Sequence, residues 1–163
     1  MKQFAHAADV LRQRLVGTWR LVSYVERDVE SSEESHPMGE RPLGLLIYAQ
    51  DGFMSVQLSS ANRLPFQGSD PYCGTPEEYT GAASRYIAYS GPFYIDVPNG
   101  SLIHEMQVSL FPNWLGQRQV RRFQIEGDLL RLATDRPMNF GGALKTATLV
   151  WRRVQSNSRP RHA

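Results

Sequence analysis

Apolar and polar residues alternate with a period of two along most of this chain, a pattern typical of β-strands that bury one face. The alternation predicts eight strands, and no helical pattern separates most of them. The strands are expected at residues 17–29, 43–50, 53–60, 86–97, 101–111, 118–125, 129–135 and 144–154. Apolar residues at helical spacing predict a short helix from Phe4 to Leu15. A second short helix is expected near 76–84, where Thr75 provides the N-cap and Pro76 the first position.

The clearest tight-turn signal is Asn99-Gly100, because both residues accept the positive φ of a type I′ turn. A two-residue turn there sets Ile95 opposite His104. It also sets Phe93 opposite Met106. All four side chains then share one largely apolar face, so His104 is expected to point into whatever that face covers.

Two further turn signals predict similar hairpins. Pairing about Asp51-Gly52 makes an apolar face of Leu45, Ile47, Ala49, Met54, Val56 and Leu58. Leu46 and Tyr48 are then expected outside. The predicted pairs about Gly127-Asp128 are Ile125 with Leu130, Phe123 with Leu132 and Arg121 with Thr134. This pairing turns Arg121 inward. In the first strand, regular alternation puts Trp19, Leu21, Ser23 and Val25 on one face, and Arg20, Val22, Tyr24 and Glu26 on the other.

Eight sequential antiparallel strands favour an all-β fold, an eight-stranded up-and-down barrel that carries the two short helices. Closing the sheet removes its exposed edges, and eight strands enclose an interior that holds side chains or one small ligand. A β-sandwich is the alternative, but three tight hairpins fit meander order better. The 163 residues fit one domain, with its core at 15–154 and a flexible tail at 155–163.

The charge of the chain is nearly balanced. The formal net charge is +2 and 21% of residues are charged, so no long-range field favours nucleic acid. No stretch approaches the roughly 20 apolar residues that span a membrane, and the N-terminus lacks the apolar core of a signal peptide. The single cysteine, Cys73, excludes an intrachain disulfide and fits a reducing compartment. We therefore expect a cytoplasmic protein.

Several stretches resemble the bacterial and fungal lipocalin-like domain family, which has a calycin-type barrel. They are Gly17-Thr18-Trp19, Gly44–Tyr48, Asp51–Ser55, Tyr86–Gly91, Ser109–Trp114 and Leu149–Trp151. The resemblance covers roughly residues 15–154 and implies a calyx for a small hydrophobic molecule. It also implies structural roles for Gly17 and Trp19. The Trp19 indole would plug the closed end, with Arg152 or Arg153 packed over it.

Two polar residues on the inward faces are candidates for function. His104 could anchor a ligand, shuttle a proton or be a satisfied core residue. Arg121 could bind a carboxylate or phenolate, or extend its charge to the rim. The residues expected to bind a ligand are His104, Arg121, Met106, Ile95, Phe93, Met54, Val56, Phe123 and Trp114. The histidines lack metal-ligand spacing, so neither a metal nor a cofactor is expected.

The leading interpretation is that the barrel binds a small hydrophobic or aromatic molecule in its cavity, without catalysis. One alternative is an isomerase, cyclase or hydrolase acting on a polyketide-like or aromatic substrate, with His104 as the catalytic residue. A second is haem binding through His104, which requires this histidine near an open rim. A third is a partner-binding module or homodimer. That alternative uses an exposed patch of Val22, Tyr24, Leu46, Tyr48 and Phe53.

Overall fold

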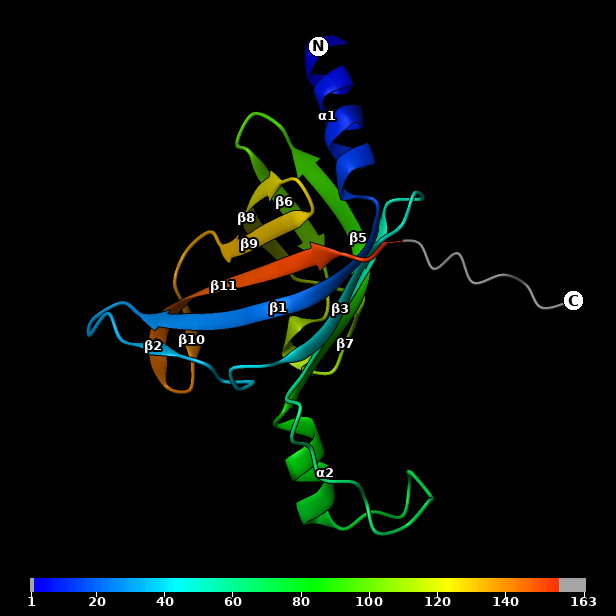
Figure 1. The fold of residues 1–163 in the computed structure, drawn as a ribbon, viewed down its shortest axis with the longest axis vertical. Helices are drawn as coiled ribbons and strands as arrows, with labels where there is room; N and C mark the ends of the chain where they lie inside the picture. Colours follow the sequence, from blue (N-terminus) through cyan, green and yellow to red (C-terminus); the bar gives the residue numbers. More distant parts are fainter. Residues whose placement is uncertain (1, 156–163) are drawn as a thin grey trace, which may run out of the picture.

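The computed structural model describes residues 2–155, which form a closed antiparallel β-barrel (Figure 1). Eight strands make the barrel: β1 (Gly17–Asp28), β3 (Leu43–Tyr48), β4 (Phe53–Ser59), β5 (Tyr86–Asp96), β6 (Ser101–Glu105), β8 (Arg118–Glu126), β9 (Leu129–Thr134) and β11 (Ala143–Arg153). Each pairs with the next, and pairing of β1 with β11 closes the ring. The predicted up-and-down barrel is confirmed. Of the tail predicted at 155–163, residues 156–163 lie outside the described residues.

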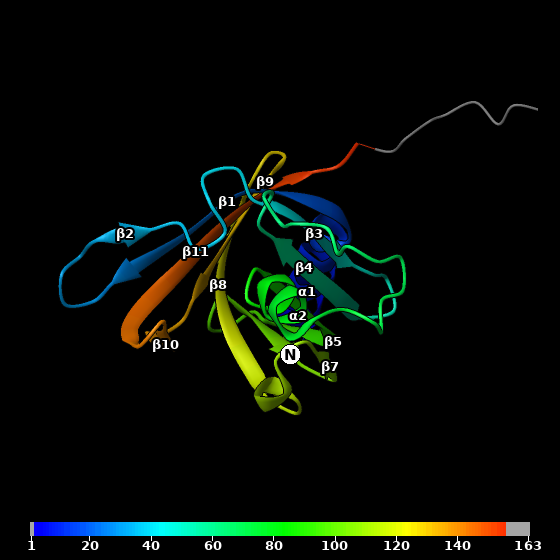
Figure 2. The same cartoon turned by 90° about the horizontal axis from the view of Figure 1, so that it is seen from below.

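Shorter elements complete the fold: α1 (Lys2–Leu15), β2 (Glu34–Ser35), α2 (Pro76–Ala83), β7 (Val108–Ser109), the 3₁₀ turn η1 (Pro112–Trp114) and β10 (Met138–Phe140). α1 and α2 lie at opposite ends of the molecule (Figure 1), so the two helices overlap in a view from the α2 end (Figure 2). α2 begins as predicted. The Thr75 side chain accepts from the Glu78 N–H, and the Glu78 carboxylate accepts from the Thr75 N–H, which is a capping box.

The hairpin of β8 and β9 pairs as predicted about Gly127-Asp128. Arg121 faces Thr134, and the other predicted pairs are also present. Arg121 is therefore buried on the inner face, whereas Arg122 beside it points outward.

The hairpin of β3 and β4 differs from the prediction by one residue. The Ala49 N–H donates to the Phe53 carbonyl at 2.8 Å, which leaves a three-residue loop at 50–52 rather than a two-residue turn. This loop ends in Gly52, which has φ +92°. Tyr48 consequently faces Met54. A slip of one residue exchanges the two faces of a strand, so Tyr48 points inward. Leu45 and Ile47, which were predicted inside, are 45% and 42% exposed.

The hairpin of β5 and β6 differs by two residues, because its loop spans residues 97–100. Pro98 has no N–H, so it cannot form the hydrogen-bonded pair that would flank a two-residue turn at Asn99-Gly100. Phe93 therefore faces His104 instead of Met106. A shift of two keeps each side chain on its predicted face, and His104 is fully buried as expected.

β1 changes face in its middle. Its register against β11 shifts between Leu21 and Ser23, as at a β-bulge. Beyond this bulge, Tyr24 and Glu26 are buried, and Ser23 and Val25 lie on the other face, contrary to the regular alternation. The Tyr24 hydroxyl donates to Glu26 Oε1 at 2.6 Å. Burial, together with this hydrogen bond, raises the pKa of Tyr24 above its ordinary value.

The predicted exposed patch is largely buried. Tyr24, Leu46 and Tyr48 belong to the core, and only Val22 and Phe53 are exposed. The prediction was wrong for Leu46 and Tyr48 because of the register of β3, and for Tyr24 because of the bulge in β1. The apolar side chains exposed on β3 are instead Leu43, Leu45 and Ile47.

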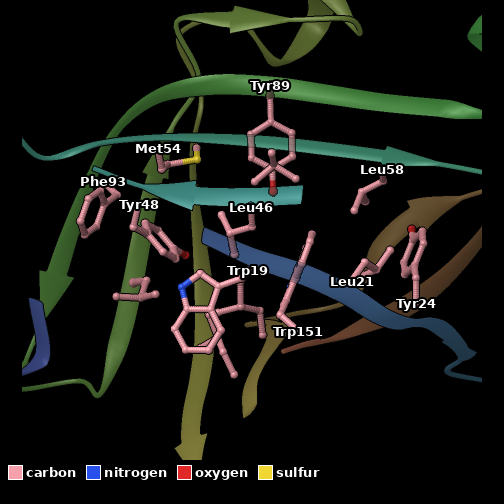
Figure 3. Close-up of a cluster of buried hydrophobic side chains, with 14 of the residues drawn as sticks. Trp19, Leu21, Tyr24, Leu46, Tyr48, Met54, Leu58, Tyr89, Phe93 and Trp151 are labelled. Atoms are coloured by element: carbon pink, nitrogen blue, oxygen red, sulfur yellow. The ribbon is translucent and has the colours of Figure 1, made fainter. Parts of the chain in front are cut away.

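The buried apolar cluster fills much of the barrel (Figure 3). It runs from Phe93 and Tyr48, past Trp19 and Trp151, to Leu58. α1 packs at the Phe93 end, where the Arg12 guanidinium lies 5.0 Å from the centre of the Phe93 ring. This end of the barrel is therefore closed by side chains.

Trp19 plugs the closed end, and Arg153 packs over it. The Trp19 Nε1 donates to the carbonyl of Leu15 at 2.8 Å, and the Arg153 guanidinium lies 4.1 Å from the indole centre. Arg152, the other candidate, is exposed, so its predicted structural role was wrong. Gly17 makes room for Arg153, because a Cβ at this position would lie 2.9 Å from its Nη1.

Gly91 marks a close approach of two strands. The predicted interruption at Gly91-Pro92 does not end β5, but the strand changes partner there. Residues before Gly91 pair with β7, and residues from Phe93 onward pair with β6. A Cβ on Gly91 would overlap the backbone carbonyl oxygen of Glu105. Only glycine therefore fits between the two backbones.

Candidate functional site

A cavity of about 40 Å³ lies inside the barrel toward the α2 end. It is lined by Tyr24, Leu58, Ile87, Tyr89, Trp114, Gln119, Arg121, Thr134, Met138, Phe140, Ala147 and Leu149. These residues come from seven strands and from η1, so barrel closure is what brings them together. Most of the wall is apolar or aromatic, and its only charged residue is Arg121.

Arg121 brings a positive charge to this cavity. The residue is 8% exposed. Its Nη1 donates to the Val120 carbonyl at 3.3 Å, and its Nη2 donates to Gln119 Oε1. Among the salt bridges between described residues, none involves Arg121. A buried cation without a counter-ion is costly, so the cavity favours a hydrogen-bond acceptor or an anion at this point.

Four polar side chains extend from the core to the cavity. The Tyr48 hydroxyl and His104 Nε2 form a hydrogen bond of 2.8 Å. His104 and Gln119 face each other in the pairing of β6 with β8, and Gln119 in turn accepts from Arg121. His104 Nδ1 and Gln119 Nε2 are buried and have no hydrogen-bond partner in the described part of the chain. The two unpaired atoms thus belong to directly opposed residues.

His104 does not line the cavity. It is fully buried, and its ring centre lies 5.7 Å from that of Tyr48 and 6.2 Å from that of Tyr89. Burial, assisted by the positive charge of Arg121, lowers the pKa of His104 to about 3. The imidazole is therefore neutral at physiological pH. Acid–base catalysis and haem ligation both need access to a ligand, and this position of His104 does not provide it.

The depressed pKa of His104 predicts a loss of stability in mild acid. The unfolded chain binds a proton at His104 near pH 6.5, whereas the folded protein does so only near pH 3. Between these values the unfolded state holds more protons, so the free energy of unfolding falls as the pH falls, by up to about 1.4 kcal/mol per pH unit. Urea unfolding between pH 6.5 and pH 5 measures this slope. In His104→Gln the slope should be shallower, and parallel profiles for the two proteins would contradict the assignment.

The cavity is flanked by two surface depressions of opposite character. Three residues line both the cavity and an apolar groove beside α2: Ile87, Trp114 and Phe140. Three others line both the cavity and a polar pocket between β8 and β10: Gln119, Arg121 and Met138. The cavity therefore has an apolar side toward α2 and a polar side toward β8.

Of the residues predicted to bind a ligand, Arg121 and Trp114 line the cavity. His104, Met106, Phe93, Met54 and Val56 are buried in the core, and Ile95 and Phe123 pack against it. Ten lining residues were not predicted: Tyr24, Leu58, Ile87, Tyr89, Gln119, Thr134, Met138, Phe140, Ala147 and Leu149. Gln119 had a signal in the sequence, because it lies two residues before Arg121 and so shares its face. Thr134 could also have been predicted, because the hairpin about Gly127-Asp128 pairs it with Arg121.

Among residues 2–155, no three His, Cys, Asp or Glu side chains are grouped so that they could hold a metal ion. The same residues contain no helix with the length and apolar character needed to cross a membrane.

Comparison with known proteins adds two findings. A family model described as a lipocalin-like domain matches residues 16–154. The chain is also similar to the 4'-hydroxy-3'-methoxypropiophenone carrier protein of Aspergillus oryzae. The two are 35% identical over 107 residues, which cover 62% of this chain and 96% of the relative.

Proposed function

Because this chain belongs to the lipocalin-like domain family, we propose that it binds one small aromatic molecule in the barrel and holds it without transforming it. The observation that carries the proposal is Arg121, a buried guanidinium with no carboxylate partner among residues 2–155, at the wall of an otherwise largely apolar cavity. Ligand pockets commonly combine an apolar lining with a few polar groups that orient the ligand.

Arg121 sets the expected chemistry of the ligand. Its guanidinium donates to carbonyl, carboxylate or phenolate oxygens. The relative is named as the carrier of a phenolic aryl ketone, whose carbonyl, methoxy and hydroxyl groups are all acceptors. A ligand of this class would place one oxygen on Arg121 and its ring against the aromatic wall at Tyr89 and Trp114. An aryl ketone or phenol is therefore the proposed ligand class.

The present volume of the cavity implies that side chains move when a ligand binds. Pockets for drug-sized ligands have volumes of about 300–1,000 Å³, whereas this cavity measures about 40 Å³. Ile87, Trp114 and Phe140 are the natural residues to move, because space lies on both sides of them. Trp114 is partly exposed and rests edge-on against Tyr89, with ring centres 5.8 Å apart.

Calorimetric titration of the purified protein with 4'-hydroxy-3'-methoxypropiophenone tests the proposal. We expect saturable binding of one molecule per chain, accompanied by a change in tryptophan fluorescence, because Trp114 lines the cavity. Propylbenzene, which has a similar carbon skeleton and no acceptor, should bind at least about tenfold more weakly, because it leaves Arg121 without a partner. Failure of the ketone to bind saturably would contradict the proposal.

A further inference from the structure

We infer that the apolar groove beside α2 is an outer subsite for the same ligand, and that it takes an unbranched alkyl chain attached to the aryl ketone. The inference rests on the proposed function and extends it to the length of the ligand. It assigns a role to a surface that barrel closure does not require.

The groove is large and almost entirely apolar. Its volume is about 570 Å³. It is lined by Thr80, Ala83 and Ser84 of α2, by Tyr86, Ile87 and Ala88 of β5, and by Leu110, Phe111, Trp114 and Phe140. Leu110 and Phe111 are 45% and 51% exposed, so this surface leaves apolar side chains in contact with water. A bound hydrocarbon chain would remove that contact.

The groove and the interior cavity share a partition of three side chains. Ile87, Trp114 and Phe140 line both spaces, so each has one side toward the barrel interior and another toward the groove. Trp114 is held by edge contacts with Tyr89 and Phe111, with ring centres 5.8 Å and 5.6 Å apart. The Tyr89 ring belongs to the cavity wall and the Phe111 ring to the groove wall. Rotation of the Trp114 side chain would join the two spaces.

The position of Arg121 gives the ligand a direction. Arg121 lines the cavity and the polar pocket, but it does not line the groove. A ligand with its oxygen on Arg121 therefore has its opposite end toward the partition. An apolar end that is longer than the cavity has to pass Trp114, and it then enters the groove. The ligand class that fits both spaces has a polar aromatic head and an unbranched alkyl tail.

A homologous series of ligands tests this subsite. The series is 4'-hydroxyacetophenone and the corresponding butyro-, hexano- and octanophenones, titrated by calorimetry. We expect affinity to rise on the order of threefold for each methylene group that enters the groove. The rise should stop when the chain extends beyond it.

Two leucines near η1 provide a matched pair of variants. Leu110 lines the groove, and Leu115 has similar exposure, 51%, but does not line it. In Leu110→Asp, affinity should no longer rise with chain length, while 4'-hydroxyacetophenone should bind as tightly as it does to the unchanged protein. In Leu115→Asp, affinity should rise with chain length as much as it does in the unchanged protein.

The possible failures are distinguishable. If the short ketone binds and chain length has no effect, or if Leu110→Asp keeps the full gain, the outer subsite is wrong and the proposed function stands. If no member of the series binds, the proposed function fails and the subsite fails with it. Circular dichroism of each variant shows whether the barrel is folded. In a folded variant, loss of the increase in affinity with chain length can be attributed to the groove.

Discussion

Replacement of Arg121 by methionine is expected to weaken binding of the aryl ketone by about 10- to 100-fold, because hydrogen bonds to charged groups contribute roughly 1.5–3 kcal/mol. The barrel should remain folded. In the described part of the chain, the buried Arg121 has no carboxylate partner. Its removal therefore eliminates a desolvated charge, and methionine occupies a similar volume. We expect the free energy of unfolding to change little, because relief from the desolvated charge offsets the loss of the donor to the buried Gln119 Oε1. Loss of a ligand contact without loss of stability is the signature of a binding residue.

Arg122→Met is the matched control for this substitution. Arg122 is adjacent in sequence but lies on the outer face, where it pairs with Asp135 at 2.5 Å and donates to the Asn99 carbonyl at 2.9 Å. Its replacement should leave affinity unchanged and cost at most about 1 kcal/mol of stability, as is usual for an exposed ion pair. Calorimetry and urea unfolding on both variants measure the two quantities. Equal loss of affinity in both variants would mean that Arg121 does not contact the ligand.

Gly91→Ala is expected to destabilise the barrel by about 3 kcal/mol or more, which is at or above the upper end of the usual cost of overpacking. The new Cβ would overlap the Glu105 carbonyl oxygen, which belongs to the backbone and cannot rotate away. Relief requires β5 to separate from residues 105–107, where the Gln107 N–H donates to the Ser90 carbonyl at 2.9 Å. Urea unfolding at neutral pH measures the loss.

Gly81→Ala serves as the control for the glycine substitution. A Cβ on Gly81 meets no atom within 4 Å, and the residue lies within α2. Alanine favours helix there, so stability should be unchanged or higher by up to about 1 kcal/mol. A loss below about 1 kcal/mol in Gly91→Ala would show that the two strands separate easily at this point.

The number and order of the strands could be predicted from the sequence, because alternation and turn residues are local features. The β8–β9 hairpin was predicted correctly in register, since Gly127-Asp128 forms a tight turn without a neighbouring constraint. The other two registers depended on details that the turn dipeptide does not contain. One was the missing N–H of Pro98. The other was a third loop residue before Phe53, which exchanged the faces of β3.

The candidate site was less predictable than the fold. Arg121 could be placed inside because its hairpin register was right. His104 was also placed inside correctly, but face assignment does not say how deep a residue lies along the barrel axis. That depth depends on closure between β1 and β11, which are far apart in sequence. The bulge in β1 brought Tyr24 to the cavity, and such a bulge leaves no clear pattern in a single sequence.

Trp19 and Arg153 together make α1 dependent on the last strand of the barrel. The carbonyl groups at the end of a helix have no partners within it. Here Leu15 receives the Trp19 N–H, while Arg14 and Val16 receive the Arg153 guanidinium. Arg153 reaches them only after β11 has paired with β1, and contacts between such distant segments form slowly because a long loop must first close. Although α1 precedes every strand of the barrel in the sequence, it therefore acquires its contacts with Arg153 only after the last strand has paired.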